Sequence, residues 1–267
     1  MHVTKEPWLS IARDGQGPTW SKSPFKNFDV VYFFGKSNRF TIRIDRIIES
    51  LRWNRGRYAS YAVSYFLMVL LQPFRAFVPR GKLVSQNESK IKAKSLKVMV
   101  PELTSTMRWK KIAFIEYFLR ESKARYLIIS TSSSVLNFSA IIEFIEKQYE
   151  SNTMLYAGPI HTGHDCDFTS GAFTIMNRES AFMLYKNRKL IPVHVMDDIG
   201  FGSAFKELNI LPVNIKTLNI NSMQQLKSYS TKELSGTPHF RLKSGEKNSR
   251  DDVKIMLALA AMLEAKP

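Results

Sequence analysis

The chain has 267 residues, of which 44% are hydrophobic and 23% are charged, which argues against intrinsic disorder and against a protein built of membrane-spanning helices. Lys and Arg total 39 against 23 for Asp and Glu, a formal net charge of +16. This excess predicts an anionic partner, which could be a phosphorylated substrate, an acidic membrane surface or nucleic acid. The one cysteine, Cys166, excludes an internal disulfide and a cysteine-rich zinc module.

Residues 1 to 25 hold no apolar stretch of signal-peptide length, and we expect an irregular N-terminal segment there. Residues 29 to 35 are β-branched and aromatic and predict a buried strand, and apolar spacing predicts an amphipathic helix over 38–52. Residues 61 to 71 form the most hydrophobic stretch, which is too short to cross a membrane. This stretch favours a core helix. A helix docked on an anionic membrane surface remains the alternative, because basic residues flank the stretch on both sides.

The rest of the chain alternates short apolar runs with amphipathic segments. Residues 79 to 95 are polar and lysine-rich and predict a loop or linker. The patterns predict strands over 96–100, 125–130, 154–158, 172–176 and 211–215, and helices over 106–120, around 139, and over 179–186, 201–208 and 251–265. Alternation of this kind predicts an α/β fold with a mostly parallel, twisted sheet and helices on both faces.

Three loops between these elements are unusual in composition. Four small polar residues, 131 to 134, directly follow the strand RYLIIS. A Ser-Gly-Ala turn, 170 to 172, precedes the strand AFTIM, and an Asp-Asp pair at 197 and 198 precedes a helix. Because open α/β sheets bind ligands at the carboxyl ends of their strands, these loops are the candidate site. Each also has a simpler interpretation, as a helix-capping turn, a tight bend and a helix cap respectively.

Taken in order, from about Leu96 to Ile215, the segments resemble the fringe-like glycosyltransferases of family 31. The run YLIISTSSSVLN puts serines where that family has metal-binding aspartates. The elements Tyr156-Ala157-Gly158, Ser170-Gly171-Ala172 and Asp197-Asp198-Ile199-Gly200 then match its later motifs. The resemblance implies a GT-A-like domain over residues 26–230, with residues 231–267 folding back over the donor site. It also implies an inverting, hexosyltransferase-type enzyme that moves a sugar from a nucleotide-sugar, a UDP-sugar, to a hydroxyl of a glycan or lipid-linked acceptor.

The serines are a departure from that family. Hydroxyl groups bind Mg²⁺ or Mn²⁺ far less well than carboxylates, so no cofactor is firmly predicted and a divalent cation is disfavoured. Two outcomes stay open. Transfer could proceed without a metal, with Lys and Arg side chains stabilising the nucleoside diphosphate, or the chain could be a non-catalytic relative.

The resemblance also implies roles for individual residues. Asp198 would be the general base that accepts the proton of the acceptor hydroxyl and would face a cleft near Ser170 and Gly171, while Asp197 would cap the following helix. Negative charge on the leaving diphosphate would be balanced by His239, Arg241 and Lys110. The residues expected to contact the nucleotide-sugar are Gly35, Lys36, Lys110, Ser132, Ser133, Ser134, Ser170, Gly171, Asp197, His239 and Arg241. Gly35 and Lys36 lack the glycine-rich run of a Walker loop.

A basic nucleic-acid-binding protein is the alternative from another class, on the strength of the net charge. No zinc-finger, RNP-type or Gly-x-x-Gly motif supports it, so nucleic acid is the disfavoured partner. We expect a cytoplasmic protein, peripheral to the membrane if residues 61–71 dock on lipid.

Overall fold

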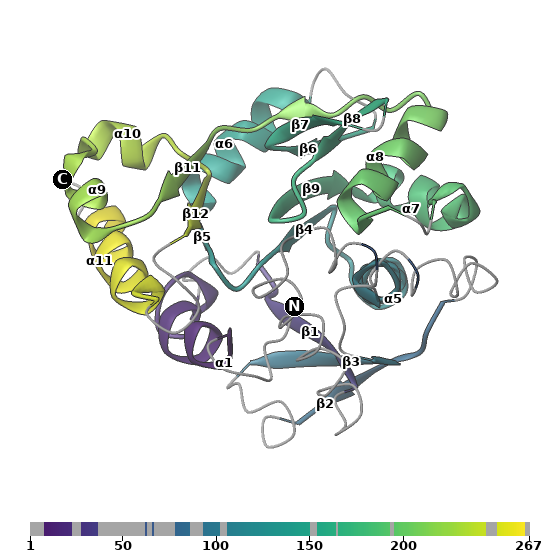
Figure 1. Ribbon diagram of the computed structural model, residues 1–267, viewed down its shortest axis with the longest axis horizontal. Coiled ribbons are helices and arrows are strands. Elements are labelled where there is room, and N and C mark those ends of the chain that lie inside the picture. The colour runs from purple at the N-terminus through teal and green to yellow at the C-terminus, as the bar shows by residue number, and fades with distance from the viewer. Residues whose placement is uncertain are drawn as a thin grey trace.

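The structure is a computed structural model, which describes residues 8–22, 28–36, 62, 66, 78–85, 93–101, 106–149, 154–163, 165–192, 195–243 and 250–264. These residues form a mixed α/β arrangement in which several small sheets are covered by helices (Figure 1). The helices are α1 (Trp8–Ser10), the π-helix η1 (Ile11–Gln16), η2 (Trp20–Lys22), α5 (Met107–Glu121), α6 (Phe138–Tyr149), α7 (Arg178–Lys186), η5 (Arg188–Leu190), α8 (Asp197–Glu207), α9 (Met223–Ser228), α10 (Thr231–Ser235) and α11 (Asp252–Glu264).

The described strands pair into four sheets. The first has the order β1 (Val31–Lys36), β3 (Lys94–Pro101), β2 (Gly81–Val84). The second, which we call the central sheet, has the order β10 (Val213–Asn214), β6 (Tyr156–Gly158), β9 (Phe173–Asn177), β4 (Tyr126–Ser130). The third has the order β11 (Thr217–Ile220), β12 (His239–Leu242), β5 (Ser134–Leu136), and β7 (Ile160–Gly163) pairs with β8 (Cys166–Thr169) as a hairpin.

The expected single, mostly parallel sheet is therefore wrong for the part of the chain that is described. Strand β9 lies between β4 and β6 and runs antiparallel to both. Among the described strands, parallel pairing is confined to β1 with β3, β6 with β10 and β11 with β12. Alternation of strands and helices favours parallel pairing only when a helix crosses over between neighbouring strands. Here β9 follows the β7–β8 hairpin and a tight turn, and no crossover helix stands before it.

Helices cover both faces of the central sheet, and successive side chains of its strands point to opposite faces. On one face Leu127, Tyr156 and Met176 belong to a core cluster shared with α5, α7 and α8. On the other face Phe173 and Ile175 pack against α6. Strands β6 and β9 are buried along their whole length, so the central sheet is the rigid frame from which the candidate loops extend.

Helices from both terminal parts of the chain, η1 and α11, pack against the third sheet. Phe240 and Leu242 of β12 pack in one cluster with residues of η1 and α11, and α11 lies against η1 (Figure 1). The N-terminal segment is therefore helical over residues 8–16 and not irregular there. Strand β2 likewise falls within the segment that was expected to be a linker.

The amphipathic helix expected over 38–52 lies outside the described residues. Of residues 61–71 only Ala62 and Phe66 are described, both helical and exposed, so the choice between core helix and membrane-docking helix stays a prediction. Within the described ranges, no helix combines the length and the apolar character that crossing a membrane requires.

Candidate functional site

The serine turn, residues 131 to 134, connects β4 to β5 at one edge of the central sheet. Its backbone carbonyls are held by the N-terminal segment. Gln16 Nε2 donates to the carbonyl oxygens of Thr131 and Ser132, at 2.9 Å each, and Trp20 Nε1 donates to that of Ser134 at 3.0 Å. The three serines are almost completely buried as a result. The turn that sequence analysis predicted as a ligand contact is thus enclosed by the protein itself.

The hydroxyls of Ser133 and Ser134 each have a partner in the C-terminal part of the chain. Arg250 Nη2 donates to Ser133 Oγ at 3.2 Å, and Asp252 holds the same guanidinium through contacts of 2.6 and 3.0 Å. His239 Nε2 lies 3.0 Å from Ser134 Oγ. The two ends of the chain therefore meet at the serine turn.

His239 lies in an environment that holds it neutral. Its side chain is fully buried, its ring stacks on Phe173 with centroids 4.5 Å apart, and Nδ1 lies 3.0 Å from Thr217 Oγ1. Burial, with a smaller contribution from the charge of Arg241, lowers the pKa of His239 from 6.5 to about 3. The expected charge-stabilising role of His239 does not fit this environment, because a neutral, enclosed imidazole offers no positive charge to a diphosphate.

A divalent cation does not fit the serine turn. Neutral hydroxyls are poor ligands for Mg²⁺ or Mn²⁺, and those of Ser133 and Ser134 already bond to protein groups. Both ring nitrogens of His239 are engaged as well. Across the ranges that the structure describes, no group of three or more His, Cys, Asp or Glu side chains could hold a metal ion.

The Ser-Gly-Ala turn joins the serine turn to the start of α8. The carbonyl oxygen of Ala172 accepts from Ser130 Oγ at 3.2 Å and from Ser134 Oγ at 3.4 Å. The backbone N–H of Gly171 donates to Asp198 Oδ2 at 3.1 Å. A Cβ on Gly171 would lie 3.2 Å from that oxygen, so the absent side chain permits the close approach of Asp198. Three loops that are far apart in sequence thus form one connected site.

Asp197 and Asp198 point to different partners. Helix α8 begins at Asp197, four residues before the predicted start, and Met196 occupies the N-cap position without a side-chain hydrogen bond. Asp197 forms an ion pair with Lys111 of α5, in which both side chains are largely buried. The expectation that Asp197 caps the helix is therefore wrong. Asp198 Oδ1 accepts from the N–H of Ile199 at 3.0 Å, and Oδ2 accepts from the N–H of Gly171, the residue near which Asp198 was expected to lie.

The remaining predicted residues lie at different distances from this cluster. Arg241 pairs with Ser134 across β12 and β5 and is partly buried. Burial and the nearby charge of Arg250 lower its pKa, which Asp252 partly offsets. Lys110 is fully buried in α5. The backbone of Gly35 and Lys36 ends β1 in the first sheet, paired with β3, so the structure does not bring them to the serine turn by strand pairing.

Sequence analysis missed four residues that the structure brings to the site: Gln16, Trp20, Lys111 and Arg250. Lys111 directly follows Lys110, which had been expected at the site, but the sequence does not distinguish the two lysines. The other three lie in segments next to the chain ends, which carry no motif and reach the turn only through packing.

Comparison with known proteins adds little to this geometry. No model of a known protein family matches the chain, and no curated protein matches it. Among solved structures, the chain is similar to a glycosyltransferase involved in the glycosylation of the major capsid of PBCV-1. The identity is 10% and the TM-score 0.40, over 86% of this chain and 100% of the other. A likeness this distant carries no argument about function.

Proposed function

We propose that the protein is a glycosyltransferase that moves a sugar from a nucleotide-sugar to a hydroxyl of a glycan or lipid-linked acceptor. One observation carries this proposal: the motifs that resemble family 31 in order along the sequence are also joined in space. Asp198 bonds to the Ser-Gly-Ala turn through Gly171, and that turn bonds to the serine turn through Ala172. Contact between loops so far apart in sequence is what a shared substrate site requires.

Asp198 is the proposed general base. Its two oxygens each accept one backbone N–H, from Gly171 and Ile199, which fixes the direction of the carboxylate. Each oxygen keeps a further lone pair with which to accept the proton of an acceptor hydroxyl. Asp198 is half-buried, so a substrate can reach it. A base held in this way contributes about 10²- to 10⁴-fold to the rate. Attack on the face opposite the leaving group gives inversion at the anomeric carbon.

Protein cations are proposed to balance the charge of the departing diphosphate. Arg241 and Arg250 are both partly exposed. The carboxylate of Asp252 raises the pKa of Arg241 and also forms an ion pair with Arg250. Two guanidinium groups against one carboxylate leave a net positive charge beside the serine turn. Guanidinium groups bind phosphate oxygens in a bidentate manner, so they suit a donor such as a UDP-sugar.

The test is transfer from a panel of UDP-sugars to simple glycan acceptors, followed by release of UDP and by mass spectrometry of the product. Asp198→Asn removes the base with almost no change of shape. We expect a loss of transfer of about 10²- to 10⁴-fold with UDP affinity unchanged. Asp29→Asn is the control, since Asp29 forms an exposed ion pair with Lys94 in another sheet. Chelation by EDTA should leave both UDP affinity and rate unchanged.

Full transfer activity in Asp198→Asn would overturn the assignment of the base. A large loss of UDP affinity on chelation would overturn metal independence. NMR analysis of the product determines whether the anomeric configuration is inverted, and a retained configuration would refute the proposed mechanism.

One observation favours a second candidate, a non-catalytic relative that binds nucleotide or sugar. The serine turn is enclosed by Gln16, Trp20 and Arg250, and its hydroxyls are already bonded within the protein. The same assay separates the two candidates. Wild-type protein that binds UDP but transfers sugar from no donor in the panel belongs to the non-catalytic class.

A further inference from the structure

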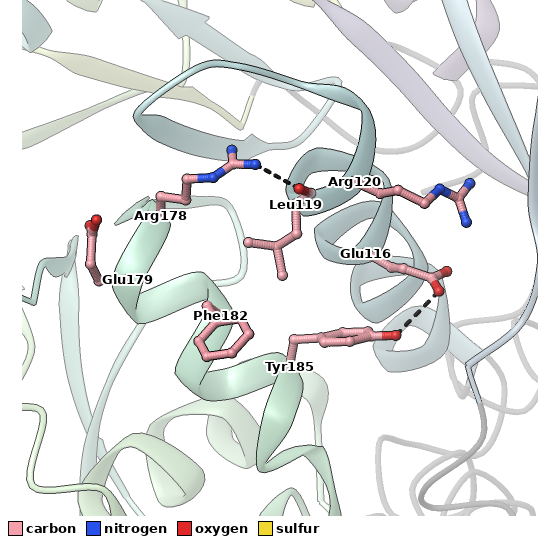
Figure 2. A pocket seen from close by; sticks show the side chains of 7 residues that line it. All are labelled: Glu116, Leu119, Arg120, Arg178, Glu179, Phe182 and Tyr185. Carbon is pink, nitrogen blue, oxygen red and sulfur yellow. Dashed lines mark hydrogen bonds between the residues drawn. The ribbon is translucent and has the colours of Figure 1, made fainter.

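A hollow lies between α5 and α7, away from the serine turn. It has a volume of about 580 Å³ and is shown in Figure 2. It is lined by Glu116, Leu119, Arg120, Arg178, Glu179, Phe182 and Tyr185. The hollow lies at the opposite end of the β4–β9 pair from the candidate site. Tyr126 pairs with Asn177 at the end next to Arg178, whereas Ser130 pairs with Phe173 at the end next to the serine turn.

Two aromatic rings of α7 face this hollow. Phe182 and Tyr185 are three residues apart on the helix and therefore share one side of it. The side chain of Phe182 is 51% exposed, although its ring is large and apolar. Tyr185 extends toward α5, where its hydroxyl donates to Glu116 Oε1 at 3.2 Å (Figure 2). The hollow thus offers an accessible apolar ring next to a carboxylate.

The charges that line the hollow balance one another. Its lining holds two carboxylates, Glu116 and Glu179, and two guanidinium groups, Arg120 and Arg178, and Arg120 also forms an exposed ion pair with Glu121. Arg178 is held by the carbonyl oxygens of Leu119, at 2.6 Å, and Ala124, at 3.1 Å, and its guanidinium lies over the ring of Phe118. In a chain of net charge +16, this balance distinguishes the hollow from a surface that collects anions by electrostatic attraction. It fits a neutral ligand.

We infer that this hollow binds a neutral carbohydrate. A sugar ring has an apolar face of C–H groups, which can stack on an exposed aromatic ring, and a rim of hydroxyl groups. Those hydroxyls can donate to the carboxylates of Glu116 and Glu179, and they can accept from the N–H groups of Arg120 other than the Nε–H that donates to Glu121. A volume of about 580 Å³ lies within the range of small-ligand sites. The inference goes beyond the proposed transfer reaction and does not depend on Asp198.

The experiment measures binding of the full chain to maltose, cellobiose, lactose and N,N′-diacetylchitobiose by saturation-transfer NMR. At least one of these sugars should bind. Phe182→Leu keeps an apolar side chain but removes the ring, and we expect affinity to fall about tenfold or more. Phe182→Tyr keeps the ring and should retain binding. Leu211→Ala removes an apolar side chain that is 78% exposed elsewhere, and it should bind as the wild type does.

The inference is overturned if none of the four sugars binds, or if Phe182→Leu binds them as tightly as the wild type. It is also overturned if Asp198→Asn abolishes binding while Phe182→Leu does not, because the sugar then occupies the candidate catalytic site. Binding of heparin that salt abolishes and Phe182→Leu leaves unchanged, with no neutral sugar bound, would assign the interaction to the net charge instead. If Phe182-dependent binding is found and no sugar transfer is detected, the proposed function fails and this inference stands.

Discussion

Replacement of Lys111 by methionine tests whether the buried ion pair with Asp197 holds the start of α8 in place. The side chains of Lys111 and Asp197 are only 7% and 14% exposed, so the variant leaves a carboxylate that water reaches poorly and that has lost its counter-ion. Removal of one partner from a buried ion pair typically destabilises a protein by about 3–5 kcal/mol. Because some exposure remains at Asp197, we expect a loss near the lower end, about 3 kcal/mol.

The assay is urea unfolding followed by circular dichroism, applied to a double-mutant cycle. Lys111→Met and Asp197→Leu each break the pair, whereas the double variant replaces it by two apolar side chains. Hydrophobic replacement of a whole buried pair is often neutral, so the double variant should be more stable than Lys111→Met. A loss below about 1 kcal/mol in Lys111→Met, or additive losses in the double variant, would refute the reasoning. Asp198 is adjacent to the pair, so Lys111→Met should also lower any transfer activity.

Two further predictions concern packing and pH. Gly202→Ala should destabilise the protein by about 1–3 kcal/mol in the same urea assay, because a Cβ there would overlap Phe168 Cβ. Stability equal to that of the wild type would contradict the close packing of α8 on β8. The folded-state pKa of His239, about 3, lies below its unfolded value of 6.5, so its contribution to stability is complete above pH 6.5 and is lost as the pH falls toward 3. Between those values wild type should lose about 1.4 kcal/mol per pH unit more than His239→Gln, and parallel stability curves would show that His239 is not buried as a neutral group.

The sequence alone located most of the elements that frame the site. Strands β4, β6 and β9 and helices α5, α6, α7 and α11 lie within a few residues of their predicted bounds. These elements have strong apolar patterns of period two or 3.6, which depend only on neighbours along the chain. Strands β11 and β12 were missed because they are short and carry polar residues such as His239 and Arg241, which hide the pattern.

The loops of the candidate site could also be found in the sequence, because small polar residues between a strand and the next element are a local feature. Contacts between these loops depend on tertiary packing and are not such a local feature. The contact between Asp198 and Gly171 agrees with the expectation drawn from the family resemblance. The partner of Asp197 was not predictable, since nothing in the pattern around Lys111 distinguishes it from Lys110.

Tertiary structure alone decided the direction of the strands and the chemical state of the site. Placement of β9 antiparallel between β4 and β6 depends on pairing between distant segments, which local periodicity does not encode. Likewise His239 has an ordinary pKa as a free residue and becomes neutral because Phe173, Ser134 and Thr217 enclose it. Local chemistry determines which groups a chain can offer, and burial determines which of them keep their charge, because desolvation acts only once distant segments have packed together.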